Sequence, residues 1–298
     1  MRHISRLIPL TLREMLYRSS FYELRSARRL AVASKRVDIC AAQIAHLLHL
    51  SSHGSVQDKI CLEIGSGWVL SHALVFYLLG AKEVIVTDLK RHAHPSVLSR
   101  ALRQADASLL RDILAPFSEH SQIRERLDKL LRIDKFSFDA LKSFGIEYIS
   151  PVDLARQRID RRVDLVYSLS VLEHVPCEDL PPLLANLGKM LSPEGAMLHA
   201  IHLEDHGDIG NQPFAFLTLP EALYSRDQQS ARGNRIRLSE WERLFHNVPD
   251  TTTKVIYAYH RRDKPLPTEI DSSVSYSDEE DLKVSHVGIY ARKLDFPD

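Results

Sequence analysis

The chain has 298 residues, of which 44% are apolar and 26% are charged, and its formal net charge is zero. This composition is typical of a globular protein with an ample core, and the balanced charge supplies no general field for nucleic acid or a membrane surface. No apolar run approaches the ~20 residues of a membrane-spanning helix, so we expect no transmembrane segment. The three cysteines are far apart and form no Cys-x-x-Cys pair, which excludes a disulfide framework and favours a cytoplasmic location.

The first 36 residues are basic, with nine Arg or Lys and only two acids, Glu14 and Glu23. Their apolar residues predict one or two amphipathic helices, and a further helix is predicted at residues 37–50. We therefore expect an N-terminal helical lid over residues 1–55. Its arginines are either solvated or form a basic arm for an anionic partner. The remaining residues, 56–298, are expected to form one α/β domain.

A buried strand is predicted at residues 60–64, and the turn Gly65-Ser66-Gly67 and a helical apolar pattern follow it at once. Glycines allow a tight strand-to-helix turn with φ angles that a Cβ disfavours, and they let a ligand approach the backbone. A second strand, at residues 83–87, ends on Asp88, 21 residues after Gly67. A β–α–β nucleotide-binding fold places a carboxylate on ribose hydroxyls at about this spacing.

Two segments are predicted as helical insertions, at about 90–145 and 209–238, because a plain crossover between parallel strands needs far fewer residues. Residues 239–242 read as a capping box at the start of a helix, and the acid-rich residues 268–281 as a mobile loop. The regular elements predicted beyond Asp88 are strands at 146–149, 163–169, 196–202, 254–260 and 286–292 and helices at 97–114, 123–131, 181–191 and 239–245.

Three stretches resemble the motifs of class I S-adenosylmethionine (SAM) dependent methyltransferases. The turn Leu62-Glu63-Ile64-Gly65-Ser66-Gly67 resembles motif I, which has an acid two residues before its first glycine. The dinucleotide spacing Gly-x-Gly-x-x-Gly is not met, because position 70 is Leu70. Asp164 to Ser168, with Leu172-Glu173-His174-Val175 after it, resembles motif IV and its sequel. Leu191 to Gly195 resembles the turn before strand five.

The resemblance implies a Rossmann-like seven-stranded α/β sheet in the class I methyltransferase order, with an N-terminal helical segment and helical insertions. It makes residues 56–298 a SAM-binding domain. It also implies that Glu63 lies near the methionine amino group, that Asp88 binds the ribose, and that Asp153, at the start of the next helix, bonds the adenine amino group. The other cofactor-binding residues that it implies are Gly65, Ser66, Gly67, Leu154, Ser168 and Leu169.

His202, Asp205 and His206 follow the fifth strand and form the richest titratable group of the chain. Three interpretations are open: substrate binding or general-base catalysis, a solvated loop, and metal ligands. The sequence offers no further ligand set, so we predict no metal site. His202 and His206 are the first candidates for the base, ahead of His174. The candidate substrate-binding residues are Asp205, Arg235 and Arg237.

The predicted activity is O-methylation of a small-molecule or glycan-type acceptor by SAM. Nucleic acid is not expected as a substrate, because strand four ends in Tyr167-Ser168-Leu169-Ser170 and lacks the Asn/Asp-Pro-Pro-aromatic stretch that serves base amino groups. Two alternatives remain. One is a non-catalytic, SAM-binding regulatory protein of the same fold, and the other is an NAD-dependent dehydrogenase.

Overall fold

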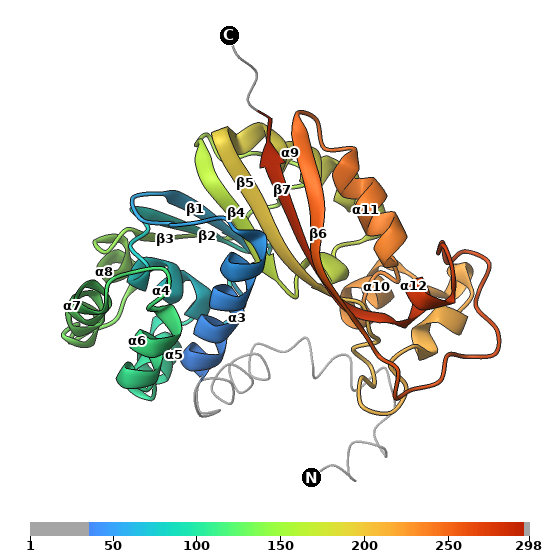
Figure 1. The fold of residues 1–298 in the computed structure, drawn as a ribbon, viewed down its shortest axis with the longest axis horizontal. Helices are drawn as coiled ribbons and strands as arrows, with labels where there is room; N and C mark the ends of the chain where they lie inside the picture. Colours follow the sequence, from blue (N-terminus) through green and yellow to red (C-terminus); the bar gives the residue numbers. More distant parts are fainter. Residues whose placement is uncertain (1–35, 295–298) are drawn as a thin grey trace.

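Seven strands form one sheet in the order β3-β2-β1-β4-β5-β7-β6, in a computed structural model that describes residues 36–294 (Figure 1). The first five strands are parallel, and β7 runs antiparallel between β5 and β6. The predicted seven-stranded α/β sheet is confirmed. The strands are β1 (Ile60–Ile64), β2 (Glu83–Thr87), β3 (Ile146–Ile149), β4 (Val163–Leu169), β5 (Leu191–His202), β6 (Thr251–His260) and β7 (Val284–Lys293).

Strands β1, β2 and β4 are buried on both faces, which explains their nearly continuous apolar sequences. In β1, Cys61 packs on one side of the sheet and Leu62 on the other, and both are fully buried. Strand β1 lies between β2 and β4, where Cys61 is opposite Val84 and Leu165. The carboxyl ends of these three strands therefore meet at one edge of the sheet.

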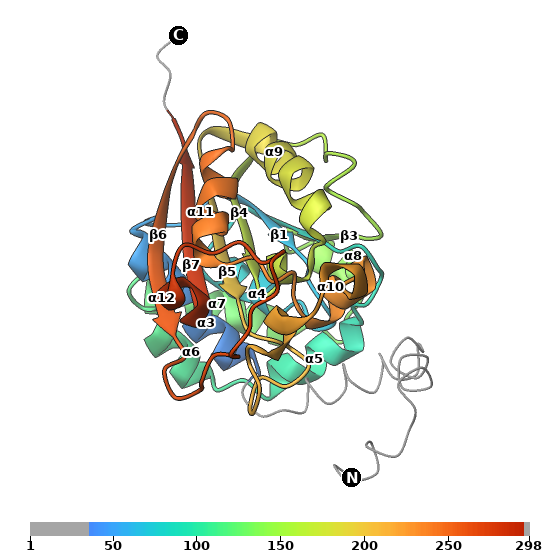
Figure 2. The ribbon, with the colours of Figure 1, turned by 90° about the vertical axis from the view of Figure 1, so that its right-hand side faces the viewer.

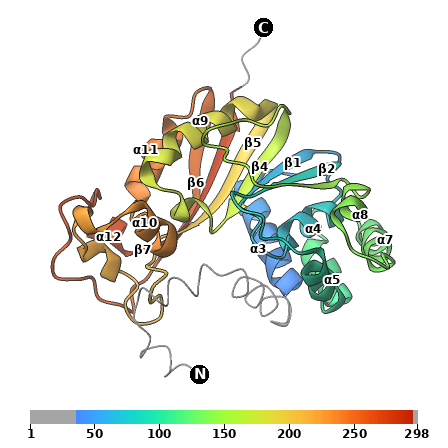
Figure 3. The ribbon, with the colours of Figure 1, turned by 180° about the vertical axis from the view of Figure 1, so that it is seen from behind.

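Helices cover both faces of the sheet. Helices α3 to α7 lie on one face, and α9 and α11 on the other (Figures 1 and 3). Helices α10 and α12 both lie at the end of the molecule that faces the viewer in Figure 2, on opposite sides of that view. The helices are α3 (Arg36–Ser51), α4 (Ser71–Leu78), α5 (Pro95–Arg103), α6 (Ala107–Leu114), α7 (His120–Leu131), α8 (Phe138–Lys142), α9 (Leu180–Met190), α10 (Arg226–Arg232), α11 (Leu238–His246) and α12 (Glu279–Lys283).

Helix α3 belongs to the main core, because Val37, Cys40 and Ile44 are buried in the same cluster as the sheet residues. It is the described part of the predicted lid, whose residues 1–35 lie outside the described range, as do the helices predicted there. The two predicted insertions contain α5 to α8 and α10. Within residues 36–294, no helix is both long and apolar enough to cross a membrane.

Two predicted helix starts are wrong, and in both a side chain has another partner. Asp153 begins a turn, not a helix, and its Oδ1 accepts the amide of Ala155 at 3.0 Å. Ser239 does not cap α11, which begins at Leu238. Its hydroxyl and its amide both donate to Asp281 instead, the amide at 3.2 Å, so a tertiary contact replaces the local capping box.

Two other boundaries differ from the prediction. Strand β5 begins at Leu191, five residues earlier than predicted, because residues 192–195 form an irregularity within the strand and not a separate turn. The acid-rich segment 268–281, predicted as a mobile loop, ends inside α12. Asp281 is buried in the first turn of α12, where it accepts hydrogen bonds from Ser239 and Ser277.

Candidate functional site

A cavity of about 690 Å³ opens at the carboxyl ends of β1, β2 and β4. Its walls come from the glycine turn after β1, the end of β2, the turn after β3 and the segment after β4, and α10 contributes Arg226 and Ser230. Open α/β sheets bind their ligands at this edge. Five of the predicted cofactor residues line the cavity: Gly65, Gly67, Asp88, Asp153 and Leu154.

The glycine turn is pinned to the end of β2. The amides of Gly65 and Ser66 donate to the Thr87 carbonyl at 2.9 and 3.0 Å. Gly65 and Gly67 have φ angles of 69° and 60°, in the left-handed region. Leu70 also has a left-handed φ of 55°, which delays the start of α4 until Ser71. The turn therefore presents backbone, not side chains, to the cavity.

Replacing Gly65 with Ala is expected to destabilise the protein more than replacing Gly67. Both changes put a Cβ at a left-handed φ, which costs about 1–2 kcal/mol. A Cβ on Gly65 would also lie 2.6 Å from the Val171 side chain. A Cβ on Gly67 would have no atom within 4 Å. Because the Val171 side chain is restricted at χ1 and cannot easily move away, we expect the clash to destabilise Gly65→Ala by roughly a further 1–3 kcal/mol. Urea unfolding of both variants measures the difference.

The matched control is Gly65→Ala combined with Val171→Ala. Shortening Val171 removes the clash, so the double variant should recover part of the lost stability. An equal loss of unfolding free energy in Gly65→Ala and Gly67→Ala would contradict the expected contact with Val171.

Asp88 lies at the end of β2 with its carboxylate at the cavity wall. One oxygen accepts the Gly67 amide at 3.0 Å, and the other accepts the Lys90 amide at 3.2 Å. Ser66 is placed behind it, with its hydroxyl 3.5 Å from Asp88 Oδ2, and does not itself line the cavity. Backbone contacts thus orient Asp88, and each of its oxygens can accept further hydrogen bonds from a ligand.

The remaining walls near Asp88 fit a flat, partly apolar ligand. Leu89 is 62% exposed although it is a large apolar residue, and it faces the cavity together with Leu154. Trp68 also lines the cavity, and its buried Nε1 has no hydrogen-bond partner among residues 36–294. A ligand with an apolar ring, hydroxyl donors and a hydrogen-bond acceptor, such as SAM, suits this lining.

Glu63 does not reach the cavity. It is buried on the α3 side of the sheet, where it accepts the Tyr167 hydroxyl at 3.1 Å and lies 3.4 Å from His72 Nδ1. Burial alone would lower the pKa of His72, but the charge and hydrogen bonding of the Cys40 sulfur, as a thiolate, and of the Glu63 carboxylate outweigh it and raise this pKa to about 10. Glu63 is therefore paired with a cationic imidazole below the glycine turn.

Ser168 and Leu169 also lie outside the cavity lining. Ser168 is fully buried, and its Oγ is 2.7 Å from His199 Nδ1. Leu169 packs against the core under α3 and α4. The residues after β4 that do line the cavity are Ser170, Val171, His174, Val175, Pro176, Asp179 and Leu183.

Four histidines gather beside the cavity. The ring centroids of His174 and His206 are 4.5 Å apart, those of His202 and His206 are 4.9 Å apart, and those of His202 and His286 are 5.6 Å apart. Burial lowers the pKa of His174, and burial with the neighbouring imidazoles lowers that of His206 to about 3. His174 alone among them lines the cavity, and His202 Nε2 is paired with Glu204 at 2.5 Å.

The predicted substrate residues have protein partners. Asp205 is buried and forms an ion pair with Arg232. The guanidinium of Arg235 stacks on Tyr224, 4.0 Å from the ring centroid. Arg237 is fully buried and donates to the backbone carbonyls of β-strand residues and their neighbours, not to the cavity. None of the three lines the main cavity.

Other residues of the cavity wall were missed in the sequence. Leu89 and Trp68 each sit one residue beyond a predicted site residue, so their positions were a usable signal. Arg226 and Ser230 gave no such signal, because only the folding of the second insertion brings α10 to the cavity. The insertion's aromatic residues Phe214 and Phe216 instead form a small core of their own.

A family model described as a methyltransferase domain matches residues 36–250. This match covers more than half of the chain, and the chain therefore belongs to this methyltransferase family. It is an enzyme, its methyl donor is SAM, and the expected cofactor and fold class are confirmed. The dehydrogenase alternative is set aside. No curated protein matches the chain.

Several solved structures are similar to the chain at low sequence identity. A Nostoc punctiforme protein assigned as an O-methyltransferase has 17% identity and a TM-score of 0.44, over 85% of this chain and 55% of that one. The N-methyltransferase NodS of Bradyrhizobium japonicum has 15% identity and a TM-score of 0.40, over 85% and 94%. A SAM-dependent methyltransferase of Mesorhizobium loti has 15% identity and a TM-score of 0.46, over 85% of this chain and 98% of that one. The chain thus spans about half the length of the Nostoc protein.

Proposed function

We propose that this methyltransferase methylates an oxygen atom of a small molecule or of a glycan-type acceptor. The observation that carries the proposal is the group of histidines at the β4 side of the cavity, of which His174 faces into it. An acceptor hydroxyl has to lose its proton during methyl transfer, and neutral imidazoles are suited to handle that proton. An amine or thiol acceptor has less need of such a group.

The donor would occupy the β2 side of the cavity. We assign ribose binding to Asp88, the adenine surroundings to Asp153, Leu154 and Leu89, and close backbone approach to Gly65. When bound, SAM supplies a methyl group on a positively charged sulfur, so the protein needs no nucleophile of its own. The residues of the chain then have to position the acceptor, exclude water and handle the proton.

His174 is oriented for this task. Its Nδ1 lies 2.9 Å from the Ser230 carbonyl, which can only accept, so Nδ1 carries the hydrogen. The Nε2 atom therefore keeps its lone pair. We therefore propose His174 as the residue that acts on the acceptor proton, whereas His206 and His202, the first candidates in the sequence, lie next to it and do not line the cavity.

The way α10 borders the cavity supports a small acceptor, or the end of a glycan. Arg226 lies at the cavity wall and is held there by ion pairs with Glu178 and Asp179. A double-stranded nucleic acid would need an open, positively charged surface, whereas this wall carries both signs of charge. We therefore propose no nucleic-acid substrate.

Replacing Asp88 with Ala should weaken the binding of SAM and of its demethylated product by roughly 10- to 100-fold. This range corresponds to the loss of hydrogen bonds to a charged group, about 1.5–3 kcal/mol. Isothermal titration calorimetry measures it, and the melting temperature of the variant checks that the turn around Gly67 is intact. The exposed acid Asp128 provides the control, since Asp128→Ala should bind both ligands as the wild type does.

The acceptor is tested with a methyl-labelled donor and a panel of paired compounds that differ only by a hydroxyl or an amine at one position. Label on hydroxyl compounds, reduced at least about tenfold in His174→Ala, is the expected result. Label found on amines alone would overturn the oxygen assignment. Full affinity of Asp88→Ala for SAM would overturn the proposed ribose contact.

A further inference from the structure

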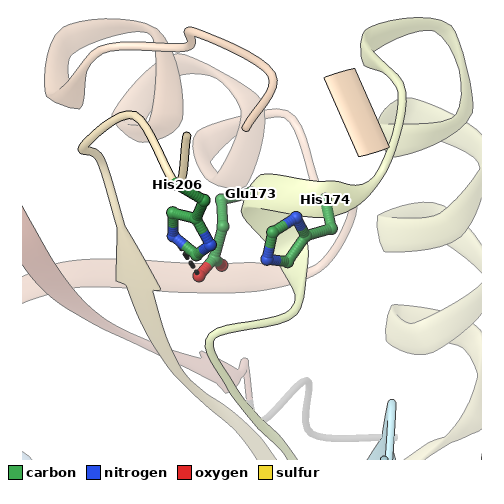
Figure 4. A group of neighbouring side chains, drawn as sticks. All are labelled: Glu173, His174 and His206. Carbon is green, nitrogen blue, oxygen red and sulfur yellow. Dashed lines mark ion pairs between the residues drawn. The ribbon is translucent and has the colours of Figure 1, made fainter. Parts of the chain in front are cut away.

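We propose that Glu173, His174 and His206 form a binding site for one divalent transition-metal ion beside the cavity. The three residues each offer a ligand atom, and these atoms lie within 4.8 Å of one another (Figure 4). The sequence predicted no metal here, because it grouped His206 with its neighbours His202 and Asp205. Folding instead brings His206, after β5, to the short helix after β4 that carries Glu173 and His174.

Glu173 is the centre of the proposed site. It is 1% exposed, and neither of its carboxylate oxygens has a hydrogen-bond partner among residues 36–294. The nearest basic atom is His206 Nε2, at 4.0 Å from Oε1, which is too long for a hydrogen bond. A buried carboxylate without a partner is costly, and a bound cation would satisfy it.

The two imidazoles turn their free nitrogens toward this carboxylate. His174 donates its Nδ1 hydrogen to the Ser230 carbonyl at 2.9 Å, which leaves Nε2 as the ligand atom. This arrangement, with the second ring nitrogen bonded to a carbonyl, is the usual one for a metal-binding histidine. His206 Nε2 is buried and has no hydrogen-bond partner within the described part of the chain, and Figure 4 shows it directed at Glu173.

The backbone that carries these side chains is held in place. The Asn234 amide donates to the Glu173 carbonyl at 2.7 Å, and the Asn234 side chain donates to the Leu172 and Val175 carbonyls at 2.9 and 3.0 Å. The His206 amide donates to the Arg232 carbonyl at 3.0 Å. Ligand atoms of one zinc ion lie about 3.3 Å apart, so small side-chain rotations on this fixed backbone would complete the site.

The ligand chemistry selects the ion. Two imidazoles and one carboxylate suit Zn²⁺, Mn²⁺, Fe²⁺ or Co²⁺, whereas Mg²⁺ and Ca²⁺ prefer oxygen ligands throughout. Three protein ligands leave coordination positions open, and His174 also lines the cavity. An acceptor hydroxyl that binds at an open position would lose its proton to solvent more readily, because a cation lowers the pKa of an oxygen that it binds.

This role in methyl transfer rests on the proposed function, whereas metal binding itself does not. In the transfer, the bond from sulfur to the methyl carbon breaks and a bond from the acceptor oxygen to that carbon forms. His174 and His206 would then act on the acceptor as metal ligands and not as free bases. The ion thus explains why two neutral imidazoles adjoin a buried carboxylate at this position.

The test is a titration of chelator-treated full-length protein with Zn²⁺ by calorimetry and with Co²⁺ by visible absorption, without donor or acceptor. We expect one equivalent to bind and the melting temperature to rise by several degrees. Glu173→Gln, which keeps the shape of the side chain, and His206→Ala should each weaken binding at least about 100-fold and abolish the rise. His202→Ala and the exposed His120→Ala are controls and should bind as the wild type does.

Absence of stoichiometric binding by the wild type would overturn the proposal. Equal binding by His206→Ala and His120→Ala, or a loss in His202→Ala as large as that in His206→Ala, would overturn the ligand set. Methyl transfer to oxygen by a protein that binds no metal would also overturn the proposed metal site while leaving the proposed function intact. Metal binding without transfer to oxygen would support the site and contradict the proposed function instead.

Discussion

Replacing Arg237 with Ala is expected to lower the free energy of unfolding by about 3–5 kcal/mol, the cost of breaking a buried charged network. Arg237 is fully buried, and its two terminal nitrogens donate to the carbonyls of Leu203 and Val284. These carbonyls belong to the segment after β5 and to the start of β7, and Arg237 itself precedes α11. One side chain thus joins three elements.

The charge of Arg237 is retained inside the protein. Burial lowers its pKa to about 10, while Asp281 and Glu204 act in the opposite direction, so the side chain stays cationic at neutral pH. Without it, two buried carbonyls lose their donors and two acids lose a favourable neighbour. The loss of unfolding free energy in Arg237→Ala should therefore be larger than the loss on replacing an ordinary surface arginine.

Arg235 provides the matched control, because it lies two residues away and is only partly buried. It stacks on Tyr224 and donates to the Leu219 carbonyl, so Arg235→Ala should cost about 1 kcal/mol. Urea unfolding of the two variants separates these roles. Similar losses of unfolding free energy in both variants would show that the buried position of Arg237 does not determine its contribution to stability.

Acidification from pH 7.5 to pH 5 should destabilise the protein by about 2 kcal/mol through His199 alone. His199 is fully buried beside Ser168, and its Nε2 has no hydrogen-bond partner within residues 36–294. Burial lowers its pKa from 6.5 to about 3. Between these two pH values the unfolded chain binds a proton that the folded protein excludes, so stability falls as the pH falls.

The measurement is urea unfolding at pH 7.5 and pH 5.0 for the wild type and for His199→Gln. Glutamine does not titrate, so the difference between the two pH values should shrink by about 2 kcal/mol in the variant. A dependence of comparable size remains for each of His53 and His286, whose pKa values burial lowers to about 4, and for His206, whose pKa is lowered to about 3. The exposed His120→Gln should keep the full dependence of the wild type. An unchanged pH dependence in His199→Gln would contradict the role of this histidine.

The strand pattern and the donor end of the cavity were both predictable from the sequence. Strands β1 to β4 occur at the predicted residues, because buried parallel strands have short apolar runs that Gly, Pro or charged residues interrupt. Gly65, Gly67 and Asp88 meet at the cavity because each directly follows a strand, and parallel neighbours end at the same edge. The position of these three residues in the chain, just after a strand, is therefore enough to place them at this edge of the sheet.

The direction of a side chain at a strand end was not predictable in this way. Glu63 and Ser168 both lie on strands that lead to the cavity, yet Glu63 faces Tyr167 and His72, and Ser168 faces His199. Side chains alternate between the faces of a strand, and the choice depends on which partners the helices place there. A motif specifies the residue type but not these partners.

Contacts between distant segments were decided by the tertiary structure alone. Ser239 bonds to Asp281, 42 residues away, in place of its local cap, and Glu173 meets His206 from a different strand end. Helix α10 reaches the cavity from an insertion without any periodic signal. The sequence by itself determined the strands, the glycine turn and the donor-side acid, since these depend on local backbone geometry. The tertiary structure decided the histidine cluster, because only packing brings its residues within reach of one another.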